Sequence, residues 1–302
     1  MQQREPAANV DVATVQGFGR EWQTFTQESG ALSDADRAAI FHCYFDLFPW
    51  HLVDGESFGA DIGCGSGRWA QLVAPRVGRL LACDASAAAL AVARRNLEQH
   101  SNVECHLAAI DRLPVADGAL DFAYCLGVLH HVPEPERALG AIARKLKPGA
   151  PLLVYLYYAF DNRPRWYRAL WQATNAARLA IARLPYKSQL ALTTLIAVLV
   201  YWPLARSAAL LDRFDFLPAG WPLAWYRDKS LYVMRTDAFD RFCTRLEHRF
   251  TRAEIADMLQ RAGFRQIAFS PREPYWCAVG IRSDGHSKSG LPDFDHLDSQ
   301  VG

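Results

Sequence analysis

Residues 61–67 read Asp-Ile-Gly-Cys-Gly-Ser-Gly, a spacing of glycines that is typical of a ligand-binding turn. A short apolar run precedes the glycines, and a segment compatible with a helix follows them. Glycine has no Cβ atom, so Gly63 and Gly65 allow the backbone to bend at positive φ and to approach a ligand closely. A turn between a strand and a helix also presents free backbone N–H groups to a ligand. The stretch therefore predicts a cofactor site.

A second chemically informative residue is Asp84, which ends the apolar run at residues 80–83. It lies about twenty residues beyond the glycine turn, where an acidic residue commonly binds the ribose of a nucleotide cofactor. A carboxylate suits this position because it accepts hydrogen bonds from both ribose hydroxyl groups. We therefore expect Asp84 to contact a ribose.

The spacing of the glycines distinguishes between two cofactors. Dinucleotide-binding turns read G-x-G-x-x-G, whereas the third glycine here follows after a single residue and Asp61 lies two residues before the first glycine. This pattern resembles motif I of the class I S-adenosylmethionine (SAM) methyltransferases, whose consensus is close to D-x-G-C-G-x-G. The resemblance implies SAM as the cofactor.

Three further segments resemble this family, in the family's order. Residues 113–121 are similar to the segment LPFPDGSFD, residues 126–132 to the loop VLHHL after strand four, and residues 146–149 to the turn LKPGG before strand five. Together with motif I they extend the resemblance over roughly residues 57–158. The segment Phe-Gly-Arg-Glu-Trp at residues 18–22 is also similar to the N-terminal part of this group.

The resemblance implies a set of cofactor contacts. The glycines would line the methionine and ribose side of SAM, Asp61 would support the turn, and the carbonyl of Leu126 would accept from the methionine ammonium group. The whole expected set is Trp22, Asp61, Gly63, Cys64, Gly65, Gly67, Asp84, Ala85, Ala109, Ile110, Asp111 and Leu126.

One position departs from the family pattern. Relatives often carry G-D-A where this chain reads Ala108-Ala109-Ile110, so the aspartate that binds the adenine amine is replaced by Ala109. Either Asp111 or backbone groups would make that contact. Trp22 either closes over the cofactor as part of a lid or packs on the core.

The catalytic candidates are His130 and His131, which follow the fourth expected strand. Open α/β sheets build their sites at the carboxyl ends of strands. Methyl transfer from a sulfonium requires an aligned nucleophile and sometimes a base. His130 would match the catalytic histidine of plant-type O-methyltransferases. The alternative is that His130 bonds to the backbone and shapes the loop.

Alternating strands and helices surround these residues and predict an α/β fold, a Rossmann-like doubly wound sheet with a helical insertion after strand five. The expected strands are residues 57–62, 79–84, 102–107, 120–125, 152–156, 266–269 and 275–281. The expected helices between them are residues 67–76, 86–98 and 134–146, followed by a helix that opens with a Thr251–Glu254 capping box. We divide the chain into an N-terminal helical arm or lid at 1–50, a SAM-binding core at 51–158, a helical insertion or acceptor cap at 159–250, a closing helix and strands at 251–282, and a disordered tail at 283–302.

The insertion is basic and then apolar. Residues 160–190 carry six basic residues against one acidic residue, and residues 190–204 are almost entirely apolar. Three interpretations follow: an apolar cap over the acceptor or a homodimer face, a peripheral membrane contact through residues 160–210, or a membrane-spanning helix.

Composition narrows the function classes. The chain has 302 residues, of which 51% are hydrophobic, and its 33 basic residues nearly balance 32 acidic ones, which argues against a nucleic-acid partner. Seven cysteines without a C-x-x-C pair argue against a zinc site or a disulfide scaffold, so we expect no metal. The N-terminus shows no signal peptide, and we expect a cytoplasmic protein with membrane association left open.

The sequence therefore predicts methyl transfer to an oxygen or carbon atom of a small or lipid-like acceptor. One alternative is a membrane-associated enzyme of an isoprenoid, quinone or lipid-linked acceptor. The other is a SAM-binding protein with a non-methylating function.

Overall fold

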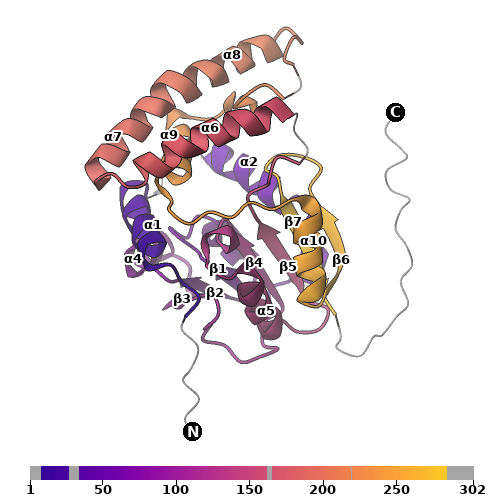
Figure 1. Ribbon diagram of the computed structural model, residues 1–302. Helices are drawn as coiled ribbons and strands as arrows, with labels where there is room; N and C mark the ends of the chain where they lie inside the picture. The colour runs from indigo at the N-terminus through magenta and orange to yellow at the C-terminus, as the bar shows by residue number, and fades with distance from the viewer. Residues whose placement is uncertain (1–7, 27–33, 162–164, 219, 284–302) are drawn as a thin grey trace.

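A seven-stranded sheet with the order β3-β2-β1-β4-β5-β7-β6 forms the centre of the computed structural model, which describes residues 8–26, 34–161, 165–218 and 220–283 (Figure 1). Strands β1 to β5 run parallel, and β7 pairs antiparallel with both β5 and β6. The strands are β1 (Phe58–Ile62), β2 (Arg79–Asp84), β3 (Val103–Leu107), β4 (Phe122–Leu126), β5 (Pro151–Tyr155), β6 (Phe264–Phe269) and β7 (Cys277–Arg282). This topology confirms the expected Rossmann-like α/β fold.

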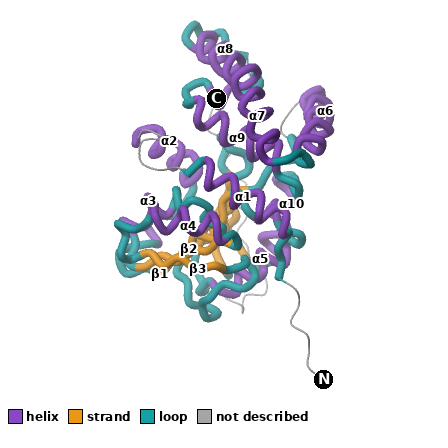
Figure 2. Tube along the Cα trace, turned by 90° about the vertical axis from the view of Figure 1, so that its left-hand side faces the viewer, coloured by secondary structure: helices purple, strands orange, loops and turns teal. Residues whose placement is uncertain are grey.

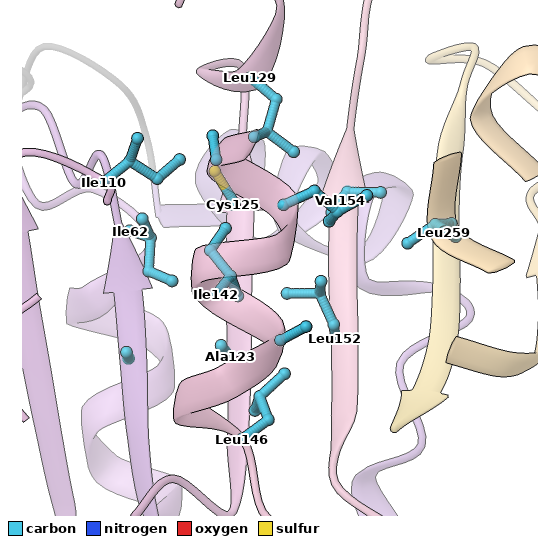
Figure 3. Close-up of a cluster of buried hydrophobic side chains, with 14 of the residues drawn as sticks. Ile62, Ile110, Ala123, Cys125, Leu129, Ile142, Leu146, Leu152, Val154 and Leu259 are labelled. Carbon is cyan, nitrogen blue, oxygen red and sulfur yellow. The ribbon is translucent and has the colours of Figure 1, made fainter. Parts of the chain in front are cut away.

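Helices cover both faces of the sheet because the central strands are apolar on both faces. Alternate strand residues point to opposite faces, so Ile62, Cys125 and Val154 pack under α5 (Pro135–Lys145) and α10 (Arg252–Arg261) (Figure 3). The intervening residues, such as Phe122 and Tyr124, pack in a second cluster on the opposite face. That cluster is covered by α2 (Asp34–Phe45), α3 (Ala70–Val73) and α4 (Ala87–Asn96).

The observed strands lie within about two residues of the expected ones at nearly every end, as is usual for such boundaries. The helix expected at residues 67–76 is shorter: α3 is followed by a 3-10 turn at Ala74–Arg76. Pro75 lies in that turn and lacks a backbone N–H, so it cannot continue the α-helical ladder. The capping box of Thr251 and Glu254 is confirmed at the start of α10.

The N-terminal arm is a helix, α1 (Val12–Thr24), that lies against the core. The Asp11 side chain caps it by accepting a hydrogen bond from the Thr14 N–H at 2.8 Å. A Cβ atom at Gly19 would lie 2.5 Å from the Ser86 hydroxyl, so α1 approaches the start of α4 very closely. Residues 1–7 and residues 284–302, which make up nearly all of the expected tail at 283–302, lie outside the described residues.

The insertion forms helices α6 to α9, which gather on the side of the sheet where the parallel strands end (Figures 1 and 2). Helix α6 (Arg165–Ile181) is followed by one continuous rod made of α7 (Tyr186–Ile196), a π-helical turn at Ala197–Tyr201, and α8 (Trp202–Asp212). The rod contains Pro203, which has no backbone N–H to donate to the preceding turn. The π-helical turn just before it is wider than an α-helical turn and accommodates the missing hydrogen bond. A short 3-10 turn, η5 (Ala224–Tyr226), then leads to α9 (Leu231–Cys243), which lies beneath the rod.

Gly59 and Gly140 provide a matched test of this packing. A Cβ atom at Gly59 in β1 would lie 2.0 Å from the Phe122 ring, whereas one at Gly140 in α5 meets nothing within 4 Å. We expect Gly59→Ala to lower the free energy of unfolding by about 1–3 kcal/mol through overpacking. Gly140→Ala should raise it by about 0.5–1 kcal/mol, because alanine suits a helix interior better. Urea unfolding measures both; equal effects of the two substitutions would contradict the packing described here.

Candidate active site

The carboxyl ends of β1, β2 and β4 form one wall of a cavity of about 110 Å³, which we call the cofactor cavity. The opposite wall is the N-terminal arm, which contributes Asn9, Phe18 and Trp22 among others. Seven of the residues expected from the sequence line this cavity. One is the catalytic candidate His131, and six were expected at the cofactor: Trp22, Gly63, Asp84, Ala85, Ile110 and Leu126.

The glycine turn shapes this cavity as the sequence predicts. Gly63, Gly65 and Gly67 have φ angles of +76°, +55° and +77°. A Cβ atom at Gly63 would lie 2.3 Å from the Val128 side chain, and one at Gly65 would lie 2.8 Å from the Trp22 indole nitrogen. Larger residues would therefore displace the walls of the cavity as well as strain the backbone.

Asp84 holds the turn from the end of β2. Its Oδ2 atom accepts a hydrogen bond from the Gly65 N–H at 2.9 Å, and its Oδ1 atom accepts one from the Ser86 N–H at 2.7 Å. A carboxylate has about four acceptor positions, so each oxygen retains one for a ligand. Burial raises the pKa of Asp84, while these two N–H groups act against that rise.

Asp61 lies behind the turn and is almost fully buried. Burial raises the pKa of its carboxyl to about 8, and its Oδ2 atom has no hydrogen-bond partner among the described residues. A cationic ligand group close to Asp61 would favour its charged form. A carboxyl of this kind fits a cofactor that carries an ammonium and a sulfonium group.

Six of the twelve expected cofactor residues are not part of the cavity lining: Asp61, Cys64, Gly65, Gly67, Ala109 and Asp111. Cys64 is buried, and Gly67 packs against Leu97. Ala109 lies in a turn where only its neighbours Ala108 and Ile110 reach the cavity.

Asp111, expected at the adenine, instead binds the arm. Its carboxylate accepts the Asn9 N–H at 3.2 Å and pairs with Arg137 at 2.9 Å. The Asn9 side chain in turn exchanges hydrogen bonds with the backbone of Glu134, donating at 2.7 Å and accepting at 3.0 Å. The start of the arm is therefore fastened to the core at the rim of the cofactor cavity. Sequence spacing gave no signal for this contact.

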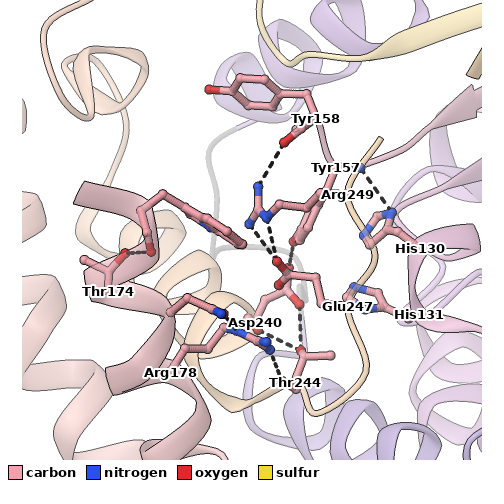
Figure 4. Close-up of polar contacts among 12 residues, drawn as sticks. His130, His131, Tyr157, Tyr158, Thr174, Arg178, Asp240, Thr244, Glu247 and Arg249 are labelled. Carbon is pink, nitrogen blue, oxygen red and sulfur yellow. Dashed lines mark hydrogen bonds and ion pairs between the residues drawn. The ribbon is translucent and has the colours of Figure 1, made fainter. Parts of the chain in front are cut away.

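The two histidines differ in their surroundings (Figure 4). His130 is fully buried and stacks on Tyr157, with ring centroids 3.9 Å apart, and burial lowers its pKa so that it stays neutral. Its Nδ1 atom accepts the Tyr157 N–H at 3.4 Å, and His130 is not among the residues that line the cofactor cavity or the second cavity beside it. This placement supports the structural interpretation of His130 over the catalytic one.

His131 lines the cofactor cavity rather than a separate acceptor site. Its Nδ1 atom lies 2.7 Å from the Leu246 carbonyl oxygen and must carry the hydrogen, because a carbonyl only accepts. Burial lowers its pKa, so the ring is neutral.

A second cavity, of about 140 Å³, adjoins the first, and we call it the acceptor cavity. Phe18, Trp22, Leu126 and Gly127 line both cavities. The second cavity also reaches the insertion, because α9 contributes Thr236, Asp237, Asp240 and Arg241. A third hollow shares Tyr44, Tyr155 and Asp237 with it and extends toward Trp221 and Trp225.

The sequence analysis did not identify the polar residues of the acceptor cavity. Glu21 comes from α1, Arg68 from the loop after the glycine turn, and Asp237 and Asp240 from α9. The i, i+3 spacing of the two aspartates places them on one face of the helix, which is the one local signal available. Burial, reinforced by the nearby Asp240 and Asp237, raises the pKa of Glu21 well above its usual value. Burial also raises the pKa of Asp237 to about 6.

Comparisons with known proteins bear on this geometry. Residues 60–154 match the family model "Methyltransferase domain". The chain is 36% identical over 152 residues to a ubiquinone biosynthesis O-methyltransferase of Hahella chejuensis, covering 49% of this chain and 62% of that protein. It is 35% identical over 109 residues to the protein of the same name from Alkalilimnicola ehrlichii, covering 35% of this chain and 43% of the relative. The matched part is thus less than two thirds of either relative.

Among solved structures, a putative methyltransferase from Bacillus halodurans is similar with a TM-score of 0.47 and 17% identity, covering 78% of this chain and 72% of that one.

The position of Asp84 yields a prediction about ribose recognition. Asp84→Ala should weaken adenosine binding by about 2–4 kcal/mol, because two ribose hydroxyl groups lose a charged acceptor. It should hardly change the binding of 2′,3′-dideoxyadenosine, which lacks those groups. Titration calorimetry of both nucleosides measures the difference, with Glu104→Ala on the exposed edge of β3 as the control. Equal losses for the two nucleosides would show that Asp84 only supports the glycine turn.

Proposed function

We propose that the chain transfers a methyl group from SAM to an oxygen or carbon atom of a small or lipid-like acceptor, and the match of residues 60–154 to the family model "Methyltransferase domain" supports this. The observation that carries the proposal is the junction of the two cavities. The two cavities adjoin, since both are lined by Phe18, Trp22, Leu126 and Gly127. A cofactor in the first cavity would therefore lie directly beside an acceptor in the second.

Each part of the chain has a defined task in this proposal. SAM, when bound, supplies an activated methyl group on a sulfonium. The glycine turn and Asp84 bind its adenosine part, and the cationic part of SAM would favour the charged form of Asp61, which is buried behind the turn. The arm closes the cofactor cavity from outside through Phe18 and Trp22, which excludes water, and α9 supplies one wall of the acceptor cavity. Positioning of this kind provides much of the catalysis in a displacement reaction.

The acceptor class follows from the lining of the second cavity. Tyr44, Tyr155, Tyr157, Tyr158 and Tyr226 line it together with carboxyl and guanidinium groups. Aromatic walls with polar edges suit a ring that carries polar substituents. The relatives named ubiquinone biosynthesis O-methyltransferases support an oxygen acceptor.

The proposal is tested by following the methyl group. Incubation with SAM labelled in the methyl carbon and a panel of small phenols, carboxylic acids and prenylated quinols should label at least one acceptor. Gly63→Ala should abolish both SAM binding and labelling, because its Cβ atom would displace Val128. Gly118→Ala is the matched control, since Gly118 also has a positive φ of +66° but faces open space. Tight SAM binding without labelling of any acceptor would instead support the non-methylating alternative.

A second feature favours a lipid surface as a partner. The rod of residues 186–212 is long and apolar enough to cross a membrane, yet only 22% of its apolar window is buried. Its buried stripe of Thr193, Ala197, Tyr201 and Ala205 packs toward α9, at the i, i+4 spacing of one helix face. The opposite face exposes Leu192, Leu195, Val198, Leu199, Val200, Trp202 and Leu210.

We propose that the rod lies flat on a membrane with this exposed face and does not span the membrane, because its other face packs on α9. Exposed Phe214 and Phe216 extend the apolar surface beyond α8, and exposed Arg183 and Lys187 lie at its other end. Basic residues beside an apolar helix face favour anionic lipid surfaces. Trp221, which borders the outer hollow, donates a hydrogen bond to the Leu204 carbonyl of the rod at 3.3 Å, so the acceptor entrance adjoins this face. The protein would then be cytoplasmic and peripheral to the membrane.

Vesicle flotation tests the membrane contact. The protein should float with vesicles that contain anionic lipid, and Leu195→Glu combined with Leu199→Glu should abolish flotation without changing SAM affinity, because both side chains are exposed. Leu192→Ala is a mild control that keeps the face apolar. A wild-type protein that stays with the unbound fraction and sediments as a homodimer would contradict the membrane contact and assign the face to a second copy.

A further inference from the structure

We propose that the acceptor cavity takes a phenol and that Asp237 is the general base that removes its proton. This inference rests on the proposed methyl transfer and adds the acceptor class and the catalytic group. The side chains involved lie far apart in the sequence but converge in the acceptor cavity.

Three carboxyl groups face this cavity and differ in how they are engaged. Asp240 accepts a hydrogen bond from the Tyr157 hydroxyl and another, at 3.3 Å, from the Thr244 hydroxyl (Figure 4). Asp237 accepts one, from the Tyr226 hydroxyl at 2.8 Å. Since a carboxylate offers about four acceptor positions, Asp237 keeps capacity for a ligand hydroxyl while Tyr226 holds its orientation.

Glu21 gives an independent indication of a ligand. Its side chain is 3% exposed and lines the acceptor cavity, and it makes no hydrogen bond or ion pair with any residue that the structure describes. A buried polar group without a partner is costly. A bound molecule with a polar group would satisfy this carboxyl, so Glu21 indicates a ligand in the acceptor cavity.

The cations in the same cavity favour a hydroxyl over an amine. An oxygen nucleophile gains negative charge as its proton leaves, whereas an amine does not. Arg68 lines the cavity, with its guanidinium 4.3 Å from the Trp69 ring centroid, and its charge lowers the pKa of both Glu21 and Asp237. Arg249 also lines it but is held by Glu247 and the Tyr158 carbonyl. Arg68 is therefore placed to stabilise a developing phenolate.

Methyl transfer to the phenol is a displacement at the methyl carbon. The phenol oxygen forms a bond to the methyl carbon, the carbon–sulfur bond breaks, and its electron pair stays on the sulfur. The phenolic proton passes to the Asp237 carboxylate and leaves to solvent through the outer hollow, which Asp237 also lines. No oxidant or metal takes part in this step.

The surroundings of Asp237 set the pH dependence. Burial raises its pKa to about 6, while the Tyr226 hydrogen bond and Arg68 act against that rise. The charged and titratable groups that face it come from every neighbouring element: Glu21, Tyr44, Arg68, Tyr155, Tyr226, Asp240 and Arg241. The base is the charged form, so turnover should fall as the pH drops through about 6. Tyr226→Phe removes a contact that lowers the pKa, so the acidic limb should move to higher pH.

Asp237→Asn tests the inference with catechol as the phenol probe and benzylamine as an amine of similar size. The wild type should methylate catechol and not benzylamine. In the variant, kcat should fall at least about a hundredfold, while SAM affinity and the calorimetric affinity for catechol beside S-adenosylhomocysteine should stay unchanged. Asp257→Asn removes an exposed carboxyl on α10 and should leave all values unchanged.

Three results would overturn the inference: full turnover by Asp237→Asn, methylation of benzylamine in preference to catechol, or methylation of neither probe by a wild type that binds SAM. A wild type that fails to bind SAM would instead refute the proposed function itself.

Discussion

The close contact between Trp22 and Gly65 is the constraint on which the site depends. A Cβ atom at Gly65 would lie 2.8 Å from the indole nitrogen, so only glycine lets the arm reach this depth. Trp22 lines both cavities, and Glu21, beside it in the chain, faces the acceptor cavity. The glycine turn therefore also sets the position of α1, whose Phe18 and Trp22 line both cavities.

Burial of carboxyl groups is the second feature that organises the site. Asp61, Asp84, Glu21 and Asp237 all have raised pKa values, with burial as the first cause in each. The chain as a whole carries nearly balanced charge, so the accumulation of carboxyl groups is a feature of this site and not of the whole chain. Buried carboxyl groups favour a cationic ligand in one cavity and a hydrogen-bond donor in the other. The charge of Arg68 acts against burial at three of these groups, since it lowers the pKa of Asp61, Glu21 and Asp237.

The sequence predicted what short-range patterns determine. The glycine turn, Asp84 and the parallel strands were found from adjacent residues, because strand–turn–helix units depend on local periodicity and backbone freedom. An acceptor site was expected beside the insertion, but its polar residues were not identified, because Glu21, Arg68 and Asp237 meet only through folding over some two hundred residues. Asp111 was one candidate for the adenine contact and His130 was a candidate base. The sequence does not show that Asp111 binds Asn9 or that His130 stacks on Tyr157. The two faces of the rod in the insertion, one packed on α9 and one exposed, could not be told apart without the fold.

The central claim is that a cofactor in the first cavity directs its reactive group into the second. A crystal structure of the protein with S-adenosylhomocysteine tests this most directly. The account predicts the ribose on Asp84, the amino acid part beside Asp61 and Leu126, and the sulfur at the shared wall, facing Asp237 across the acceptor cavity. A ligand whose amino acid part fills the acceptor cavity, or whose sulfur faces away from it, would contradict the claim.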